Sequence, residues 1–131
     1  MQQPDPLALY VTAEAQALKL TVIIPCYNEV KSIEPVLHRV LAVNLAHEIL
    51  IVDDGSTDGT LDVLKKIETD GLPGVKVVYH EKNQGKGAAL VTGFRHASGD
   101  IILIQDADFE YDPREYPILL RPLYEGITKV V

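Results

Sequence analysis

Four short apolar runs, each followed by polar residues, recur along the chain and constrain its fold more than any other feature. They are LTVIIP (20–25), EILIVDD (48–54), VKVVYH (75–80) and DIILIQDAD (100–108). Runs this short and this rich in Val, Ile and Leu are typical of strands buried on both faces, as in parallel sheets. We therefore expect a sheet at the centre of the domain.

Helical patterns separate these runs. They cover 32–43, 58–68 and 86–97. Ser32 and Asp58 are the expected N-caps of the first two helices. The expected apolar stripe of the third helix is Leu90, Phe94 and Ala97. Alternating strands and helices at this spacing predict βαβ units and an α/β fold, a Rossmann-like parallel sheet with helices on both faces.

The two ends of the chain differ from this pattern. Residues 1–18, with two prolines, are expected to form a flexible leader, and 19–131 to form the folded domain. The segment 112–126 predicts a short helix broken near Pro122, and ITKVV (127–131) reads as the start of another strand. Because a doubly wound domain rarely ends at such a point, we expect this domain to be truncated at its C-terminal end.

Composition limits the classes of function. The 131 residues are enough for one domain with a core, and the formal net charge of -7 argues against nucleic acid as a partner. A single cysteine, Cys26, excludes an internal disulfide and suits a cytoplasmic location. The N-terminus lacks the pattern of a secretory signal, and no apolar run is long enough to cross a bilayer. Any membrane association is expected to be peripheral, at the cytoplasmic face, or to belong to sequence outside this chain.

Polar residues follow all four predicted strands. These strand ends read PCYNE (25–29), DDGS (53–56), HEKN (80–83) and QDAD (105–108). In open parallel sheets, ligands bind beyond the carboxyl ends of the strands. The alternative is that any strand needs polar residues in order to turn. That explains one or two ends more easily than four, so we expect a functional edge.

Several of these residues suit a nucleotide. Tyr27 offers a ring for stacking, Glu29 offers acceptors, and Asp53 and Asp54 follow a strand where an acid can bind a ribose hydroxyl or a base edge. Turn and capping roles are the alternatives. The loop NQGKGAA (83–89) opens a helix, where backbone amides and Lys86 can face an anion. The four histidines show no ligand spacing and are interpreted as surface or capping residues, and Cys26 as a small residue at a strand end.

The segment LIQDADFEYDP (103–113) carries the strongest signal. In an extended chain, side chains two apart point the same way. The four carboxylates would then share one side: Asp106, Asp108, Glu110 and Asp112. Carboxylates of this density suit Mg²⁺ or Mn²⁺, which is usually completed by waters and substrate phosphates. Asp112 fits least well, because the Asp-Pro step resembles a helix start.

Together the pieces TVIIPCYNE, ILIVDDGSTDGT, NQGKGAALVTGF and GDIILIQDAD resemble family 2 glycosyltransferases, over residues 20 to about 125. NQGKGAAL with QDADFEYDP is most similar to the polyprenyl-phosphate branch, of the dolichyl-phosphate mannose or glucose synthase type. The resemblance implies the N-terminal, nucleotide-binding part of a glycosyltransferase A-type fold.

The resemblance also implies roles for individual residues. Pro25, Tyr27 and Glu29 would line the nucleoside pocket, and Val52 and Asp54 would contact base or ribose. Lys86 would lie near the phosphates or sugar. The family's Asp-x-Asp motif corresponds to Asp106-Ala107-Asp108. These three residues would bind the nucleotide sugar, and Asp106 and Asp108 would act in catalysis. Asp106, Asp108 and Glu110 would hold the metal.

The implied reaction is inverting transfer of a hexose from a UDP- or GDP-sugar to a polyprenyl phosphate. The alternatives are a saccharide or glycolipid acceptor, and a catalytically incomplete fragment that binds nucleotide and metal. A sugar nucleotidyltransferase is less favoured, because PCYNEVKS (25–32) is not the Gly-rich, basic segment that such enzymes carry after the first strand. An uncovered sheet edge is also compatible with a homodimer.

Overall fold

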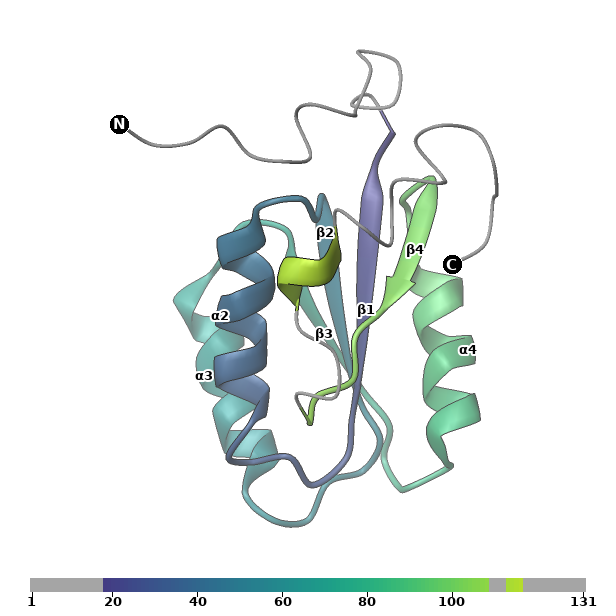
Figure 1. Ribbon diagram of the computed structural model, residues 1–131. Helices are drawn as coiled ribbons and strands as arrows, with labels where there is room; N and C mark the ends of the chain where they lie inside the picture. Colours follow the sequence, from purple (N-terminus) through teal and green to yellow (C-terminus); the bar gives the residue numbers. More distant parts are fainter. Residues whose placement is uncertain (1–17, 109–112, 117–131) are drawn as a thin grey trace.

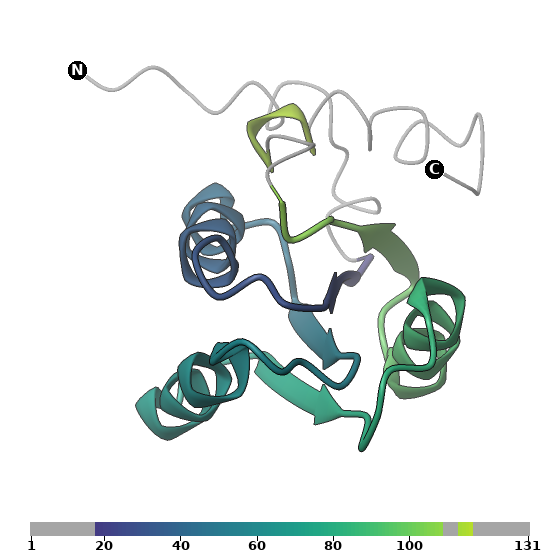
Figure 2. The same ribbon diagram turned by 90° about the horizontal axis from the view of Figure 1, so that it is seen from below.

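The computed structural model describes residues 18–108 and 113–116. In chain order the elements are β1 (Leu20–Cys26), α2 (Ile33–Val43), β2 (Glu48–Asp53), α3 (Thr60–Asp70), β3 (Val75–Tyr79), α4 (Lys86–His96), β4 (Ile101–Ile104) and the 3₁₀ turn η2 (Pro113–Glu115). The strands form one parallel sheet in the order β3-β2-β1-β4. Helices α2 and α3 cover one face and α4 the other (Figures 1 and 2). The predicted Rossmann-like fold is confirmed.

The central strands β1 and β2 are buried along their whole length, as the apolar runs predict. Strand β1 pairs with both β2 and β4 and so lies in the interior of the sheet. Strand β3 pairs only with β2 within the described sheet, and its residues are partly buried or exposed. Burial on both faces was therefore a wrong prediction for β3. It was also wrong for β4, at the other end of the described sheet, where Ile104 is 37% exposed. A strand at the edge of a sheet receives less cover.

The two faces of the sheet pack differently. Toward α2 and α3, large apolar side chains fill the core: Leu20, Val22, Ile24, Ile33, Leu37, Val40 and Leu64. Toward α4, a smaller cluster forms around Ile23, Val52 and Ala89. A Cβ at Gly93 would lie 2.7 Å from Cγ2 of Ile23, so α4 approaches the sheet through its small residues.

The expected apolar stripe of α4 is therefore wrong. The buried residues of the helix are Ala89 and Gly93, whereas Leu90 is only partly buried and Phe94 is 48% exposed. Ala97 lies at the C-cap. Periodicity of large apolar residues missed the true contact face, because close packing here requires side chains that are small.

The helix starts differ in detail from the predicted caps. Ser32 occupies the N-cap position of α2, but its hydroxyl donates to Glu29 and makes no capping bond. Helix α3 begins at Thr60, after Gly59, and the Asp58 carboxylate accepts hydrogen bonds from the Thr60 amide and hydroxyl. Asp58 therefore supports the start of α3, two residues later than the sequence pattern indicates.

Buried Glu48 braces the edge of the sheet at which the strands begin. Its carboxylate accepts hydrogen bonds from the Thr21 hydroxyl (2.9 Å) and the Ser98 amide (2.9 Å), and pairs with Lys76 (3.1 Å). Burial alone would raise the pKa of Glu48, but these donors outweigh it and hold the pKa below its ordinary value. This network is structural and leaves the opposite edge of the sheet for a ligand.

Two groups of predictions are not decided by this fold. The expected leader (1–18) lies outside the described residues except for Leu18, and the expected strand at 127–131 lies wholly outside them. Of the expected helix at 112–126, the structure describes only 113–116, which begin with the turn η2. No helix in residues 18–108 and 113–116 is long and apolar enough to span a membrane.

Candidate functional site

A pocket of about 280 Å³ opens at the carboxyl ends of the strands. Its lining comes from the loops after β1, β2, β3 and β4 and from the first turn of α4. The lining residues are Pro25, Cys26, Tyr27, Glu29, Asp54, Asn83, Gly85, Lys86, Ala89, Asp106, Ala107 and Asp108. This is the edge at which the sequence predicts a ligand.

Eight of the nine predicted substrate-binding residues line this pocket. They are Pro25, Tyr27, Glu29, Asp54, Lys86, Asp106, Ala107 and Asp108. The exception is Val52, whose side chain is fully buried and packs with Ile23 and Ala89. Glu110, the third predicted metal ligand, lies outside the described residues, as does Asp112. The structure thus brings the predicted residues together, and their individual roles stay predictions.

The Asp-x-Asp segment follows β4 but does not continue it. The strand ends at Ile104, and the chain turns at Ala107–Asp108, so the extended alternation of carboxylates does not hold through this segment. Asp106 forms an ion pair with Lys86 across the pocket (Nζ–Oδ1 2.5 Å), and Ala107 is buried. Ala107 belongs to the apolar core, whereas Asp106 is partly buried and Asp108 is exposed.

Gln105 supports this turn through hydrogen bonds. It is fully buried. Its backbone amide donates to the Ile23 carbonyl (2.9 Å), and its side-chain nitrogen donates to the Asp106 carbonyl (3.1 Å). Its side-chain oxygen accepts a hydrogen bond from the hydroxyl of buried Tyr116 (2.8 Å). The position of Asp106 is therefore set by groups that the sequence analysis did not single out.

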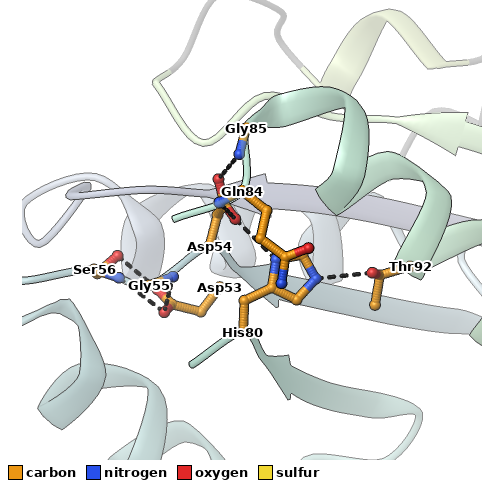
Figure 3. A network of polar contacts seen from close by, with 8 residues as sticks. All are labelled: Asp53, Asp54, Gly55, Ser56, His80, Gln84, Gly85 and Thr92. Atoms are coloured by element: carbon orange, nitrogen blue, oxygen red, sulfur yellow. Dashed lines mark hydrogen bonds and ion pairs between the residues drawn. The ribbon is translucent and has the colours of Figure 1, made fainter. Parts of the chain in front are cut away.

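The loops after β1 and β2 are joined by hydrogen bonds. The Ser56 hydroxyl accepts from the Asn28 amide (2.9 Å), and the Asn28 side chain accepts from the Thr57 amide (2.7 Å). Asp53 is fully buried and accepts from the Gly55 amide and from the amide and hydroxyl of Ser56 (Figure 3). Asp53 therefore shapes the turn and does not line the pocket.

Asp54 connects the loop after β2 to the Gly-rich loop. Its carboxylate accepts hydrogen bonds from the amides of Gln84 and Gly85 (2.9 Å each) and contacts His80 Nδ1 (2.8 Å) (Figure 3). Burial alone would raise the pKa of Asp54, but the bonds from Gln84, His80 and Gly85 hold it below its ordinary value. Asp54 is thus ionised at neutral pH, and much of its acceptor capacity is already used.

His80 contradicts the interpretation of all four histidines as surface or capping residues. Its side chain is only 8% exposed, and its Nε2 lies 2.8 Å from the Thr92 hydroxyl of α4. His38, His47 and His96 are at least partly exposed, which agrees with that interpretation. The sequence position of His80 could have indicated its place in the site. His80 directly follows β3 and so lies at the same edge of the sheet as the other polar strand ends.

The charges of the pocket fit a divalent cation. The described lining contains four carboxylates, of Glu29, Asp54, Asp106 and Asp108, and one ammonium group, of Lys86. Such a lining repels a diphosphate unless a cation accompanies it. In residues 18–108 and 113–116, no cluster of three or more His, Cys, Asp or Glu side chains could hold a metal ion. Two carboxylates with waters and diphosphate oxygens make a suitable oxygen ligand set.

Buried Cys26 also lines the pocket but does not suit a nucleophile. Burial, together with the negative charges of Asp53 and Glu29, raises the pKa of its thiol to about 12. The thiol is therefore protonated at neutral pH and acts as a small wall residue. This agrees with the interpretation of Cys26 as a residue at a strand end.

Comparisons with known proteins agree with this fold. Residues 21–131 match the model of glycosyl transferase family 2. An undecaprenyl-phosphate 4-deoxy-4-formamido-L-arabinose transferase of Salmonella paratyphi A is 35% identical over 116 residues, which are 86% of this chain and 36% of that protein. The chain thus spans about a third of the length of the curated relatives it matches.

Two solved structures share the fold. A mannosyltransferase from Pyrobaculum calidifontis, in complex with GDP-Man and Mn²⁺, is 33% identical with a TM-score of 0.69, over 82% of this chain and 32% of that one. Glucosyl-3-phosphoglycerate synthase of Mycobacterium tuberculosis, in complex with Mn²⁺, UDP and phosphoglyceric acid, is 29% identical with a TM-score of 0.72, over 95% and 45%.

The parallel sheet and its helices define a Rossmann-like α/β domain of the glycosyltransferase A type. The chain belongs to glycosyl transferase family 2. The predicted resemblance to this family is confirmed.

Proposed function

We propose that this domain binds a nucleotide sugar with Mg²⁺ or Mn²⁺, and that the whole protein transfers the hexose, with inversion, to a polyprenyl phosphate. The observation that carries the proposal is the pocket at the carboxyl edge, which Lys86 lines together with the carboxylates of Asp106 and Asp108. Family membership and the activity named for the curated relatives support the lipid acceptor. The neighbours bound to GDP-Man or UDP with Mn²⁺ support the donor class and the metal.

Different residues bind different parts of the donor. The exposed ring of Tyr27 stacks on the base, and Pro25 and Glu29 line the nucleoside pocket. Lys86, at the start of α4, faces the diphosphate with the amides of the first turn. Asp106 and Asp108 would hold the metal, with Glu110 as a further ligand. When bound, the ion supplies Lewis-acid stabilisation of the negative charge on the leaving diphosphate.

The reaction exchanges one bond for another. The bond between the anomeric carbon and the diphosphate oxygen breaks, while an oxygen of the acceptor phosphate forms a bond to that carbon from the opposite face. A phosphate monoester is anionic at neutral pH, so this acceptor needs little help from a general base. A sugar hydroxyl would need a general base. The acceptor would bring the protein to a membrane surface as a peripheral protein.

The donor site is tested by calorimetric titration of UDP and GDP into the full-length protein, with Mn²⁺ and with chelator. We expect one nucleotide to bind in the presence of metal, and Asp108→Asn to weaken it by about tenfold or more, equivalent to about 1.4 kcal/mol. The control is Asp62→Asn, the same change on the exposed side of α3. Metal-independent binding, or equal effects of the two substitutions, would contradict the assignment of the site.

The acceptor is tested separately. Sugar label from the donor should move into an organic-extractable lipid when polyprenyl phosphate is supplied. Transfer only to a water-soluble saccharide or to a glycolipid would replace the acceptor and keep the donor site.

A further inference from the structure

We propose that His80 is a positioning residue of the donor site: through Asp54 it holds the Gly-rich loop, residues 83–85, in the shape that lines the pocket. The inference rests on the proposed function, because its consequence is read in nucleotide binding. It assigns a role to a histidine whose side chain is largely buried and which the proposed binding of donor and metal does not use.

The first step concerns the hydrogen bonds between Asp54 and the loop. The amides of Gln84 and Gly85 both donate to its carboxylate at 2.9 Å, and Asn83 and Gly85 line the pocket. The backbone of Asp54 is fixed in turn, because its amide donates to the Cys26 carbonyl at the end of β1 (2.9 Å). The loop is thus tied to the sheet through one side chain.

The second step is the orientation of that side chain. An ionised carboxylate only accepts hydrogen bonds, so the ring nitrogen that faces Asp54, Nδ1 at 2.8 Å, carries a proton and donates it to the carboxylate. The other nitrogen, Nε2, forms a hydrogen bond with the Thr92 hydroxyl of α4 at 2.8 Å. The His80 amide also donates to the Asp53 carbonyl (2.8 Å), which anchors the residue to the end of β2. Figure 3 shows the ring bridging Asp54 and Thr92.

The third step reaches the ligand. The loop leads directly into α4, whose first residue, Lys86, faces Asp106. Thr92 lies in the same helix, so His80 contacts both the loop, through Asp54, and the helix that carries Lys86. The ring is 8% exposed and Asp54 4%, which makes their geometry specific and removes competition from bulk water. Loss of the Nδ1 donor should therefore loosen the wall formed by Asn83 and Gly85.

The test compares His80→Asn with His80→Gln in the full-length protein. The Asn amide nitrogen takes the place of Nδ1 and keeps a donor for Asp54, whereas the Gln amide takes the place of Nε2. We expect His80→Asn to bind the nucleotide, UDP or GDP with Mn²⁺, within about threefold of wild type, and His80→Gln to bind about tenfold more weakly. In the protein without ligand, amide exchange in 82–88 should quicken in His80→Gln, while exchange in β1 stays unchanged.

Equal nucleotide affinity of the two variants, or wild-type affinity and exchange in His80→Gln, would overturn the inference. If His80→Gln does not fold, Thr92→Val replaces it, and wild-type affinity and exchange in that variant would overturn the inference too. Failure of the wild-type protein to bind either nucleotide would instead overturn the proposed function and with it the donor-site role of His80. The exchange measurement needs no ligand, so it decides on its own whether His80 holds the loop.

Discussion

Gly55→Ala is expected to damage both stability and the pocket, because this glycine lies against the backbone of the next loop. Its φ is +77°, and an added Cβ would lie 2.5 Å from the Asn83 amide nitrogen and from the Lys82 carbonyl carbon. Backbone atoms cannot move aside as a flexible side chain can. The left-handed conformation costs an alanine about 1–2 kcal/mol. Overpacking adds about 1–3 kcal/mol.

Gly71→Ala is the matched control. Gly71 has a φ of +63° at the C-cap of α3, and an added Cβ there would meet no atom within 4 Å. Both substitutions change the unfolded chain alike, so their difference isolates the close approach at Gly55. We expect Gly55→Ala to lower the free energy of unfolding by about 1–3 kcal/mol more than Gly71→Ala.

Urea unfolding of the two full-length variants measures this difference, and titration of the nucleotide with Mn²⁺ measures the effect on the pocket. Only Gly55→Ala should weaken binding, because it displaces Asn83, which lines the pocket. Equal losses of stability in both variants, together with unchanged nucleotide affinity, would refute the argument from the close approach.

Three further predictions concern individual side chains. Tyr116→Phe removes the hydroxyl that donates to Gln105, so it should lower the free energy of unfolding in urea by about 0.5–1.5 kcal/mol and weaken Mn²⁺-dependent nucleotide binding. If neither value changes, Tyr116 and Gln105 do not support the turn at Asp106. The folded-state pKa values of Glu48 and Asp54 lie below their ordinary values, so their stabilisation is present above about pH 4 and is lost as the pH falls through the folded values. Thermal unfolding between pH 6 and 3 should show this fall, less steep in Glu48→Gln, and a flat profile would contradict it. The Cys26 thiol, with a pKa of about 12, should react with iodoacetamide at pH 8 only after unfolding, and rapid native-state labelling would disprove its burial.

Much of the architecture is local in origin. Strands β1 and β2 are continuous apolar runs, and the helices between the strands carry apolar residues at helical spacing, so their type and order could be predicted from the chain alone. The prediction of a ligand edge has the same basis, since parallel strands present their carboxyl ends together. That is why Tyr27, Lys86 and Asp106, far apart in the chain, could be assigned to one pocket from their positions after the predicted strands.

What the sequence determined by itself was therefore the order of elements, the family motifs and the edge that carries the site. Only the tertiary structure decided which partners each side chain contacts. Helix α4 faces the sheet through Ala89 and Gly93, because the space beside Ile23 admits no larger residue. Asp53 and Asp54 are neighbours of the same type, yet one closes its own turn and the other binds a loop 30 residues away. The side chain of His80 is largely buried because its partners, Asp54 after β2 and Thr92 in α4, come close to it only once the sheet has assembled.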